Sequence, residues 1–515
     1  MIQIGVKTSS RYGKLMKTRR IRSIVVLVLG MLIVAVNPAS GKELEDRKWI
    51  EVRTPNFHIR SALSEKSTVE LARYLETFRV AVSLVTNISR VDSPIPTEIY
   101  ALKRQGDLKL LGIESSSVAG IFSPGLRRNI IVIRNAYGKE EIHLIMHEYV
   151  HFLTRNHGSL NYPKWYDEGF AEYLGASRMR SGNFEIGVVP DGRRGSLAYS
   201  RWIPLREILA PTNYDKWNRE RKAMFYAEAW ALVHFLQNRP DHSASFRQDL
   251  GRYIELIESG MGDISAFEEA FAITAYDLNK QVKRYLESSS LLAFQIKLDD
   301  LIPDFEPDVI SLSREQVSLG LAQAALRLGE YDSAERWFTI ATTDETTRPQ
   351  AEAGLGDLLK FGDEFEAAQP YFERAIALAP DDPYIQLDLA EYWHDRASDS
   401  DDPAARATYI TRARTHYVEA WRLDDTMPET YTLYAQTFLM EEQRYDFAVE
   451  LLEQAESILP SNITVRRMLA EAYMGAGRTE EAIAAARSVL AWSHNESAAA
   501  NRAREILAEL TAAEE

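Results

Sequence analysis

The chain of 515 residues contains no cysteine, so it forms no disulfide bond and offers no thiolate to a metal ion. A lipid anchor attached to cysteine is excluded for the same reason. The chain also has no excess of positive charge, because 75 Asp and Glu outnumber 60 Lys and Arg and the formal net charge is −15 at pH 7. Residues 1–41 hold seven Lys or Arg and no acid, so the rest of the chain carries −22. Nucleic-acid binding needs a basic face, and we therefore expect no nucleic-acid partner.

Long hydrophobic runs are missing as well. The most apolar stretch, residues 24–36, would span about 20 Å as a helix, short of the ~30 Å hydrocarbon core of a bilayer. Basic residues precede it, and the small residues Ala39 and Gly41 suit a signal peptidase site. We predict that residues 1–41 are a signal peptide. The protein is then exported to the periplasm or cell envelope with no membrane span after signal removal; the alternative is tethering by an uncleaved signal anchor. The start codon is either Met1 or Met16.

The strongest chemical signal is the run His-Glu-Tyr-Val-His at residues 147–151, which has the pattern H-E-x-x-H inside an apolar segment with helical spacing. Helix positions four apart share a face, so His147 and His151 can bind one ion. Glu148 can reach a water molecule on that ion. This pattern predicts one Zn²⁺ per chain.

A catalytic zinc ion uses three protein ligands and one open position, so a third ligand is needed. Glu168 is the candidate, because it begins a second apolar helix after a loop that contains Gly158 and Pro163. Glu172, one turn further on, is placed to accept an N–H from a liganding imidazole.

The run at residues 147–151, followed by Trp-Tyr-Asp-Glu-Gly-Phe-Ala-Glu-Tyr at residues 165–173, resembles the gluzincin peptidases, which include the thermolysin and aminopeptidase N types. It is most similar to peptidase MA-like proteins of bacterial envelopes, which often carry tetratricopeptide repeats. The resemblance implies an α+β zincin-like fold, with His147, His151 and Glu168 as zinc ligands and Glu148 as general base. There is no G-x-M-E-N run, so aminopeptidase activity is not implied and an endopeptidase-like enzyme is expected.

The same resemblance implies a hydrogen-bond donor to the oxyanion on a downstream helix. Tyr226 is the candidate, since it lies where small residues alternate with aromatic ones, and His234 is the second choice. The alternative is that both are core residues.

The pattern around the motif predicts a small mixed sheet leading into the metal-binding helix. A hairpin at residues 118–133 is the candidate edge that would align a peptide by β-augmentation, the alternative being a plain structural hairpin. The basic turn at residues 192–195 is expected to be solvated.

We assign residues 42–290 to the metallopeptidase domain and residues 291–312, which are rich in proline and aspartate, to a linker. The expected elements are strands at 49–53, 56–60 and 97–102, a helix at 69–85, a strand from 182, and helices at about 204–210, 222–238, 244–258, 264–272 and 276–287.

Residues 313–515 repeat themselves with a 34-residue period, interrupted once by about eleven extra residues that we expect to form a loop near residues 398–403. The period and its paired small residues are those of tetratricopeptide repeats. We predict an all-α solenoid of about five repeats with a capping helix at residues 498–510. The two series of small residues are Ala322, Gly356, Ala390, Ala435 and Ala470, and Ala334, Ala368, Ala413, Ala448 and Ala482.

Together these signals favour an exported zinc-dependent peptidase whose repeats recruit a protein substrate or protein partner. The alternative is an envelope protein-binding scaffold with a structural or inactive zinc site. Glu148 favours the enzyme, because a purely structural site has no use for it. A cytoplasmic repeat adaptor is disfavoured by the signal peptide, and the repeats could also serve as a spacer or a dimerisation arm.

Overall fold

A computed structural model describes residues 43–86, 95–113, 120–134, 139–157, 162–238, 245–259, 261–287, 291, 293–301, 305–460, 462–492 and 498–514. The predicted signal peptide and its cleavage site lie outside these residues. Among the described helices, none combines the length and the apolar content that crossing a membrane requires.

The front half contains a six-stranded mixed sheet with the order β4-β5-β3-β2-β1-β9. Strands β2, β3 and β5 are parallel, and helix α2 (Glu65–Thr86) connects β2 to β3. The predicted strand pair and hairpin are confirmed, and β4 is an edge strand as predicted. The bounds are Ile50–Arg53 (β1), Phe57–Ser61 (β2), Thr97–Leu102 (β3), Gly120–Ser123 (β4), Asn129–Arg134 (β5) and Asp308–Ser311 (β9).

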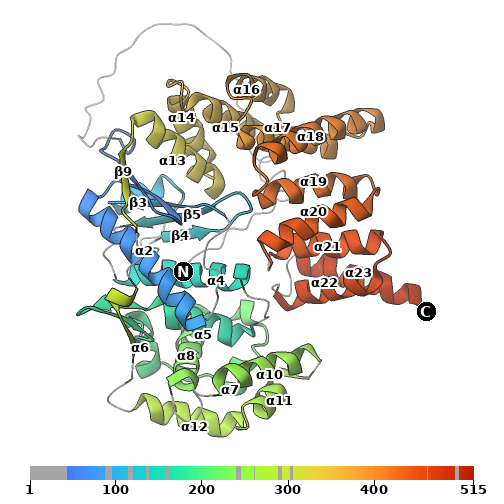
Figure 1. Ribbon diagram of the computed structural model, residues 1–515. Helices are drawn as coiled ribbons and strands as arrows, with labels where there is room; N and C mark the ends of the chain where they lie inside the picture. The colour runs from blue at the N-terminus through green and yellow to red at the C-terminus, as the bar shows by residue number, and fades with distance from the viewer. Residues whose placement is uncertain are drawn as a thin grey trace.

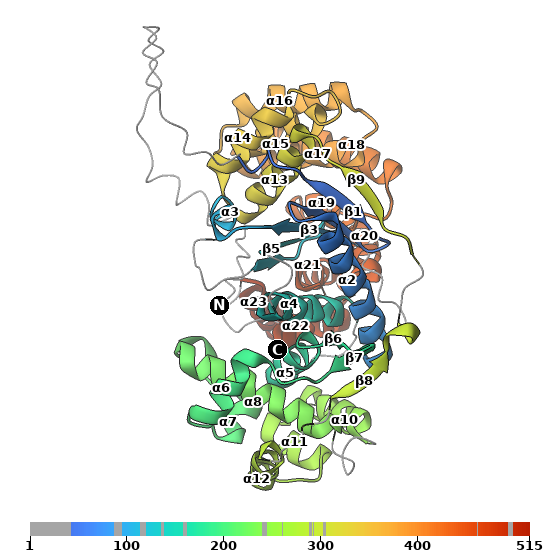
Figure 2. The ribbon, with the colours of Figure 1, turned by 90° about the vertical axis from the view of Figure 1, so that its left-hand side faces the viewer.

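Both faces of this sheet are buried. Ile99 and Ile131 lie on the face that shares a core with α2 and α4 (Lys139–His157). Their neighbours Tyr100 and Ile130 point the other way and share a core with α13 (Arg314–Leu328) and α14 (Tyr331–Ala341). Strands covered on both faces need continuous apolar sequence, which explains the run Asn-Ile-Ile-Val-Ile of β5. Figures 1 and 2 show the sheet between α13 and α4.

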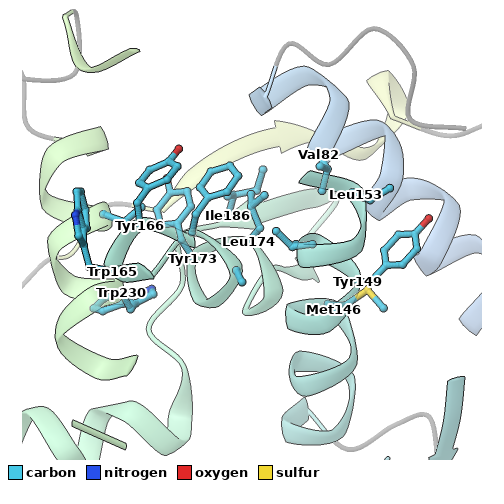
Figure 3. Packing of buried hydrophobic residues seen from close by; sticks show 14 of the residues in the cluster. Val82, Met146, Tyr149, Leu153, Trp165, Tyr166, Tyr173, Leu174, Ile186 and Trp230 are labelled. Carbon is cyan, nitrogen blue, oxygen red and sulfur yellow. The ribbon is translucent and has the colours of Figure 1, made fainter. Parts of the chain in front are cut away.

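Below the sheet lies a mainly helical region that carries the metal motif. Apolar side chains from α2, α4, α5, β7 and α8 gather between these elements (Figure 3). The helices predicted from about residue 204 onwards are confirmed. The bounds are Lys164–Gly175 (α5), Arg178–Arg180 (β6), Asn183–Ile186 (β7), Asp191–Tyr199 (α6), Leu205–Leu209 (α7), Arg219–Asn238 (α8), Phe246–Glu258 (α10), Asp263–Ala270 (α11) and Ala275–Leu286 (α12).

Residues 291–312, predicted as a linker, instead contribute strands to both sheets. β8 (Phe294–Lys297) pairs with β7 in a three-stranded sheet, and β9 pairs antiparallel with β1. Both strands are only four residues long and mostly exposed, and β9 has no alternation of apolar and polar residues that the sequence could reveal. The proline and aspartate residues around the two strands are typical of linkers, and the linker was predicted from them.

In the part of the back half that the structure describes, five antiparallel helix pairs are followed by α23 (Ala498–Glu514), as predicted. All ten small residues of the two series are buried, because each lies where two helices approach. From α13, which lies above the sheet, the array turns down one side of the front half (Figure 1). After α13 and α14 the pairs are Arg348–Phe361 (α15) with Phe365–Leu378 (α16), Pro383–Asp399 (α17) with Pro403–Leu423 (α18), Pro428–Met440 (α19) with Tyr445–Ile458 (α20), and Ile463–Gly475 (α21) with Thr479–Trp492 (α22).

The prediction that the extra residues of the third repeat form a loop is wrong. The extra residues lengthen α17 to 17 residues and α18 to 21, and only residues 400–402 connect the two helices. Asp402 accepts a hydrogen bond from the backbone N–H of Ala404, so the acidic segment caps a helix instead of forming a loop.

Candidate metal centre

Two helices bring the predicted ligands together. His147 and His151 lie on one face of α4, and Glu168 lies on the first turns of α5. Their exposed fractions are only 6%, 6% and 8%. Among the described residues this is the group of His, Asp and Glu side chains whose donor atoms converge closely enough to hold a metal ion.

The three donor atoms form a nearly equilateral triangle. His147 Nε2 and His151 Nε2 are 3.2 Å apart, and Glu168 Oε2 is 3.3 Å from the first and 3.2 Å from the second. Donors about 2.0–2.1 Å from a tetrahedral zinc ion are about 3.3–3.4 Å apart, so the geometry and the donor set both fit zinc. Burial alone would raise the pKa of Glu168, but hydrogen bonds from the two imidazoles hold it well below its usual value, so the carboxylate is ionised.

Carboxylates behind the triangle orient the imidazoles. Asp167 Oδ1 lies 3.0 Å from His151 Nδ1, and the Nε2 atom on the other side of that ring is directed towards His147 and Glu168. Glu172 Oε1 lies 3.4 Å from His147 Nδ1, within ion-pairing distance but outside hydrogen-bond geometry. Glu172 was predicted to accept an N–H from a liganding imidazole, but the structure places it near His147 without a hydrogen bond to that ring. Asp167 was not predicted at all.

One residue of the basic turn predicted to be solvated, Arg193, is instead part of this network, whereas Gly192, Arg194 and Gly195 are exposed as predicted. Arg193 lies in α6 and donates two hydrogen bonds to the Glu172 carboxylate, from Nε to Oε2 at 3.1 Å and from Nη2 to Oε1 at 2.6 Å. His143 Nε2 lies 3.3 Å from the same carboxylate. Burial would raise the pKa of Glu172, but the charges of Arg193 and His143 hold it well below its usual value. Glu172 is therefore a buried anion that Arg193 neutralises.

Glu148 is partly exposed on α4 beside the triangle. The ring of Tyr226 on α8 lies edge-on to that of His147, with centroids 5.9 Å apart, and the Arg193 guanidinium lies 5.0 Å above the Tyr226 ring. Burial, and then the charge of Glu168, raise the pKa of Tyr226, so its hydroxyl keeps its proton. The second choice, His234, is fully buried against Trp230, with Nδ1 2.8 Å from the Tyr285 hydroxyl. The structure thus places Tyr226 beside the triangle and His234 in the core.

Two glycines of α5 allow the helices to approach closely enough to form the site. A Cβ at Gly169 would lie 2.4 Å from the carbonyl oxygen of Ala229 on α8. A Cβ at Gly175 would lie 2.8 Å from the backbone nitrogen of His147 on α4. Helix α5 is therefore in backbone contact with both neighbours, which fixes Glu168 relative to the histidines.

Comparison with known proteins identifies the back half. Models of the tetratricopeptide repeat match residues 354–417 and 439–506. The C-terminal half of the chain contains tetratricopeptide repeats. No curated protein matches the sequence.

Several solved structures match part of the chain, with TM-scores of 0.33 or less. A thermophilic tetratricopeptide repeat protein of Thermus thermophilus is 22% identical, covers 38% of this chain and 99% of its own, and has a TM-score of 0.33. MamA protein is 16% identical, with 35% and 93% coverage and a TM-score of 0.28. A repeat protein of Parabacteroides merdae is 13% identical, with 53% and 87% coverage and a TM-score of 0.29.

Proposed function

We propose that the front half is a zinc-dependent peptidase of the gluzincin type and that the repeats bind a protein substrate or partner. The observation that carries the proposal is the triangle of His147, His151 and Glu168 donor atoms, with sides of 3.2–3.3 Å. Glu148 beside it supports an enzyme, since a metal site with only a structural role needs no adjacent base.

The chain's own residues would divide the chemistry as follows. A bound zinc ion would polarise a peptide carbonyl and acidify a water molecule. Glu148 accepts a proton from that water and passes it to the leaving amine. The Tyr226 hydroxyl, beside His147, donates a hydrogen bond to the developing oxyanion. Edge strand β4, which packs against α4 through Phe122 and Phe152 with ring centroids 5.9 Å apart, would align the peptide backbone.

The test combines metal analysis with cleavage of a peptide library. We expect about one zinc ion per chain in the wild type, its loss in the His147→Ala/His151→Ala variant, and its retention in His58→Ala, the matched control outside the site. Glu148→Gln should keep the metal and lose about 10²- to 10⁴-fold in activity. Full zinc occupancy in the double-histidine variant would overturn the assignment.

The second candidate is a protein-binding scaffold with an inactive zinc site, which the tetratricopeptide repeats support. The same experiment separates the two functions. If zinc binds, stabilises the fold and is lost with the histidines while wild type and Glu148→Gln show equal cleavage, the scaffold is correct.

Export is part of the proposal and rests on residues 1–41. The mature chain should be found in the envelope fraction with its N-terminus near Gly41, as N-terminal sequencing would show. A chain in the cytoplasm that still begins at Met1 or Met16 would contradict export.

A further inference from the structure

The loop of the β4–β5 hairpin, residues 124–128, inserts into the repeat array. Leu126 packs against the core of the repeats. Arg327 of α13 donates a hydrogen bond to Ser123 Oγ at 3.1 Å and another to the carbonyl of Pro124. The hairpin therefore reaches from the sheet into the surface that the repeats enclose.

At the tip of this loop, the Arg127 side chain is held by carboxylates of the repeat helices. Its three guanidinium nitrogens each contact a different carboxylate, those of Asp388 and Glu391 on α17 and Glu429 on α19. The Nη2–Oε1 distance to Glu391 is 2.7 Å, and the Nε–Oε2 distance to Glu429 is 2.6 Å. These three acids thus show which chemistry this surface recognises, a guanidinium brought by another segment.

A cavity of about 710 Å³ opens beside Arg127, between the hairpin loop and the helices of the first repeats. Its volume is in the usual range for ligand sites, about 300–1,000 Å³. Eight carboxylates line it against four basic side chains, so its lining carries a formal excess of four negative charges. One of these four basic side chains, Lys360, is only 2% exposed and is shared among Asp357, Glu391 and Asp395 at 3.1–3.5 Å.

The same cavity offers apolar surface. Phe361, which is 40% exposed, and Tyr331 form part of its wall, with ring centroids 6.2 Å apart. Long basic side chains pack their methylene stems on such surfaces while their heads bind carboxylates. Burial raises the pKa of Asp357 to about 7, and the charges of Asp388 and Glu391 add to the rise while those of Lys360 and Arg127 oppose it.

We propose that this cavity is the docking site for an arginine- or lysine-bearing segment of a polypeptide partner, which binds beside Arg127 with its basic side chains on the remaining carboxylates. The inference rests on the proposed protein-binding role of the repeats and is independent of the metal site. The acidic cavity attracts a basic segment of the partner and repels an acidic one.

The test uses the full chain with a metal chelator, so that peptidase activity plays no part. The probes are three fluorescently labelled peptides of equal length, one rich in arginine, one rich in glutamate and one of glycine and serine only. Fluorescence anisotropy should show binding of the arginine peptide alone, weakening as salt concentration rises.

The decisive variant is Asp395→Asn/Asp399→Asn, which removes two rim carboxylates other than the three that bind Arg127. It should weaken binding of the arginine peptide about tenfold, as expected for losing two partly exposed ion pairs. Asp446→Asn/Glu480→Gln, which changes two exposed acids that do not line the cavity, is the matched control and should bind like the wild type. Equal binding by both double variants, or equal binding of the arginine and glutamate peptides, would overturn the proposal.

Hydrogen exchange gives a second readout in the wild-type chain. Adding the arginine peptide should slow exchange of amides in the β4–β5 loop, α15 and α17, which line the cavity. Protection confined to other helices would place the peptide elsewhere and contradict the proposal. Neither readout depends on zinc or cleavage, so a failure of the peptidase proposal would leave this result intact.

Discussion

Single carboxylates decide how the metal-binding histidines are presented. Asp167 accepts from His151 Nδ1 at 3.0 Å and so fixes both the ring orientation and the nitrogen that faces Glu168. Glu172 lies 3.4 Å from His147 and pairs more closely with Arg193, at 2.6 Å. Asp167 and Glu172 therefore have different roles: Asp167 positions a ligand, whereas Glu172 ties α5 to α4 and α6.

Removing the Asp167 charge should weaken the metal site without unfolding it. We expect Asp167→Asn to bind zinc about 10- to 100-fold more weakly, because the amide holds the His151 ring less strongly and polarises it less. Competition with a chromogenic chelator would measure the affinity. Asp446→Asn, at an exposed position on α20, is the control, and an unchanged affinity in Asp167→Asn would show that this contact has no influence on the metal.

Glu228 on α8 makes stability depend on pH. Its side chain is 3% exposed, and burial raises its pKa to about 8, although it accepts the backbone N–H of Ile203 at 2.7 Å. Below about pH 4.5 it is protonated in both the folded and the unfolded chain. Between about 4.5 and 8 the unfolded chain releases the proton while the folded chain keeps it, so the free energy of unfolding falls as pH rises.

Glu228→Gln should remove this dependence. From about pH 5 to pH 8 the wild type should lose on the order of 3–5 kcal/mol more unfolding free energy than the variant, since each unit of pKa difference is worth about 1.4 kcal/mol. Urea unfolding across this pH range would measure it. Glu255→Gln on the exposed side of α10 should follow the wild type, and parallel curves for wild type and Glu228→Gln would contradict the assignment.

At the scale of elements, the close approach of α5 to α4 and α8 forms the site. Glu168 precedes Gly169, so any displacement of α5 from α8 moves the third ligand away from the histidines. A Cβ at Gly169 would meet a backbone carbonyl, which cannot rotate aside as a side chain can.

Gly169→Ala should therefore cost about 1–3 kcal/mol of unfolding free energy and lower zinc occupancy together. Gly195→Ala in α6 is the matched control, since nothing lies within 4 Å of its added Cβ. It should be neutral or stabilise by up to about 1 kcal/mol, because alanine is the better helix former. Thermal unfolding and metal analysis would measure both effects, and a Gly169→Ala protein as stable as Gly195→Ala would show that α5 can shift freely.

At the scale of the whole molecule, the repeats complete the front half. The sheet face with Tyr100 and Ile130 is covered by α13 and α14 and would otherwise face water. Glu45, near the start of the described chain, pairs with Arg336 at 2.6 Å and accepts from Trp337 Nε1 at 3.0 Å, both on α14. The two halves therefore share a core across the segment predicted to be a linker.

Cutting the chain near Pro303 should not yield two stable pieces. A fragment of residues 42–305 lacks β9 and the helices that cover one sheet face, so it should aggregate or bind a dye for exposed apolar surface. Residues 306–515 keep their repeat-to-repeat contacts and should remain folded by circular dichroism. Co-expression of both fragments should restore a soluble front piece by re-forming the shared core. A soluble, zinc-loaded front fragment alone would contradict the shared core.

The sequence by itself determined the features that depend on spacing along the chain. The two histidines share a face because they are four residues apart on a helix, and the helix pairs follow from small residues 34 apart. Glu168 was within reach because one short loop separates its helix from α4. The hairpin and its edge position followed from two apolar runs around Pro124 and Gly125.

Only the tertiary structure decided the contacts between segments far apart in sequence. Arg193 looked like a solvated turn residue, and its partner Glu172 is twenty-one residues away on another helix. Strand β9 is exposed and has no apolar alternation, so only its pairing with β1 defines it. Arg127 gave no signal, because its three carboxylate partners lie more than 260 residues further along the chain. Local periodicity reports which face of an element is apolar, but the element that covers this face, and the charges it brings, are set by packing across the whole chain.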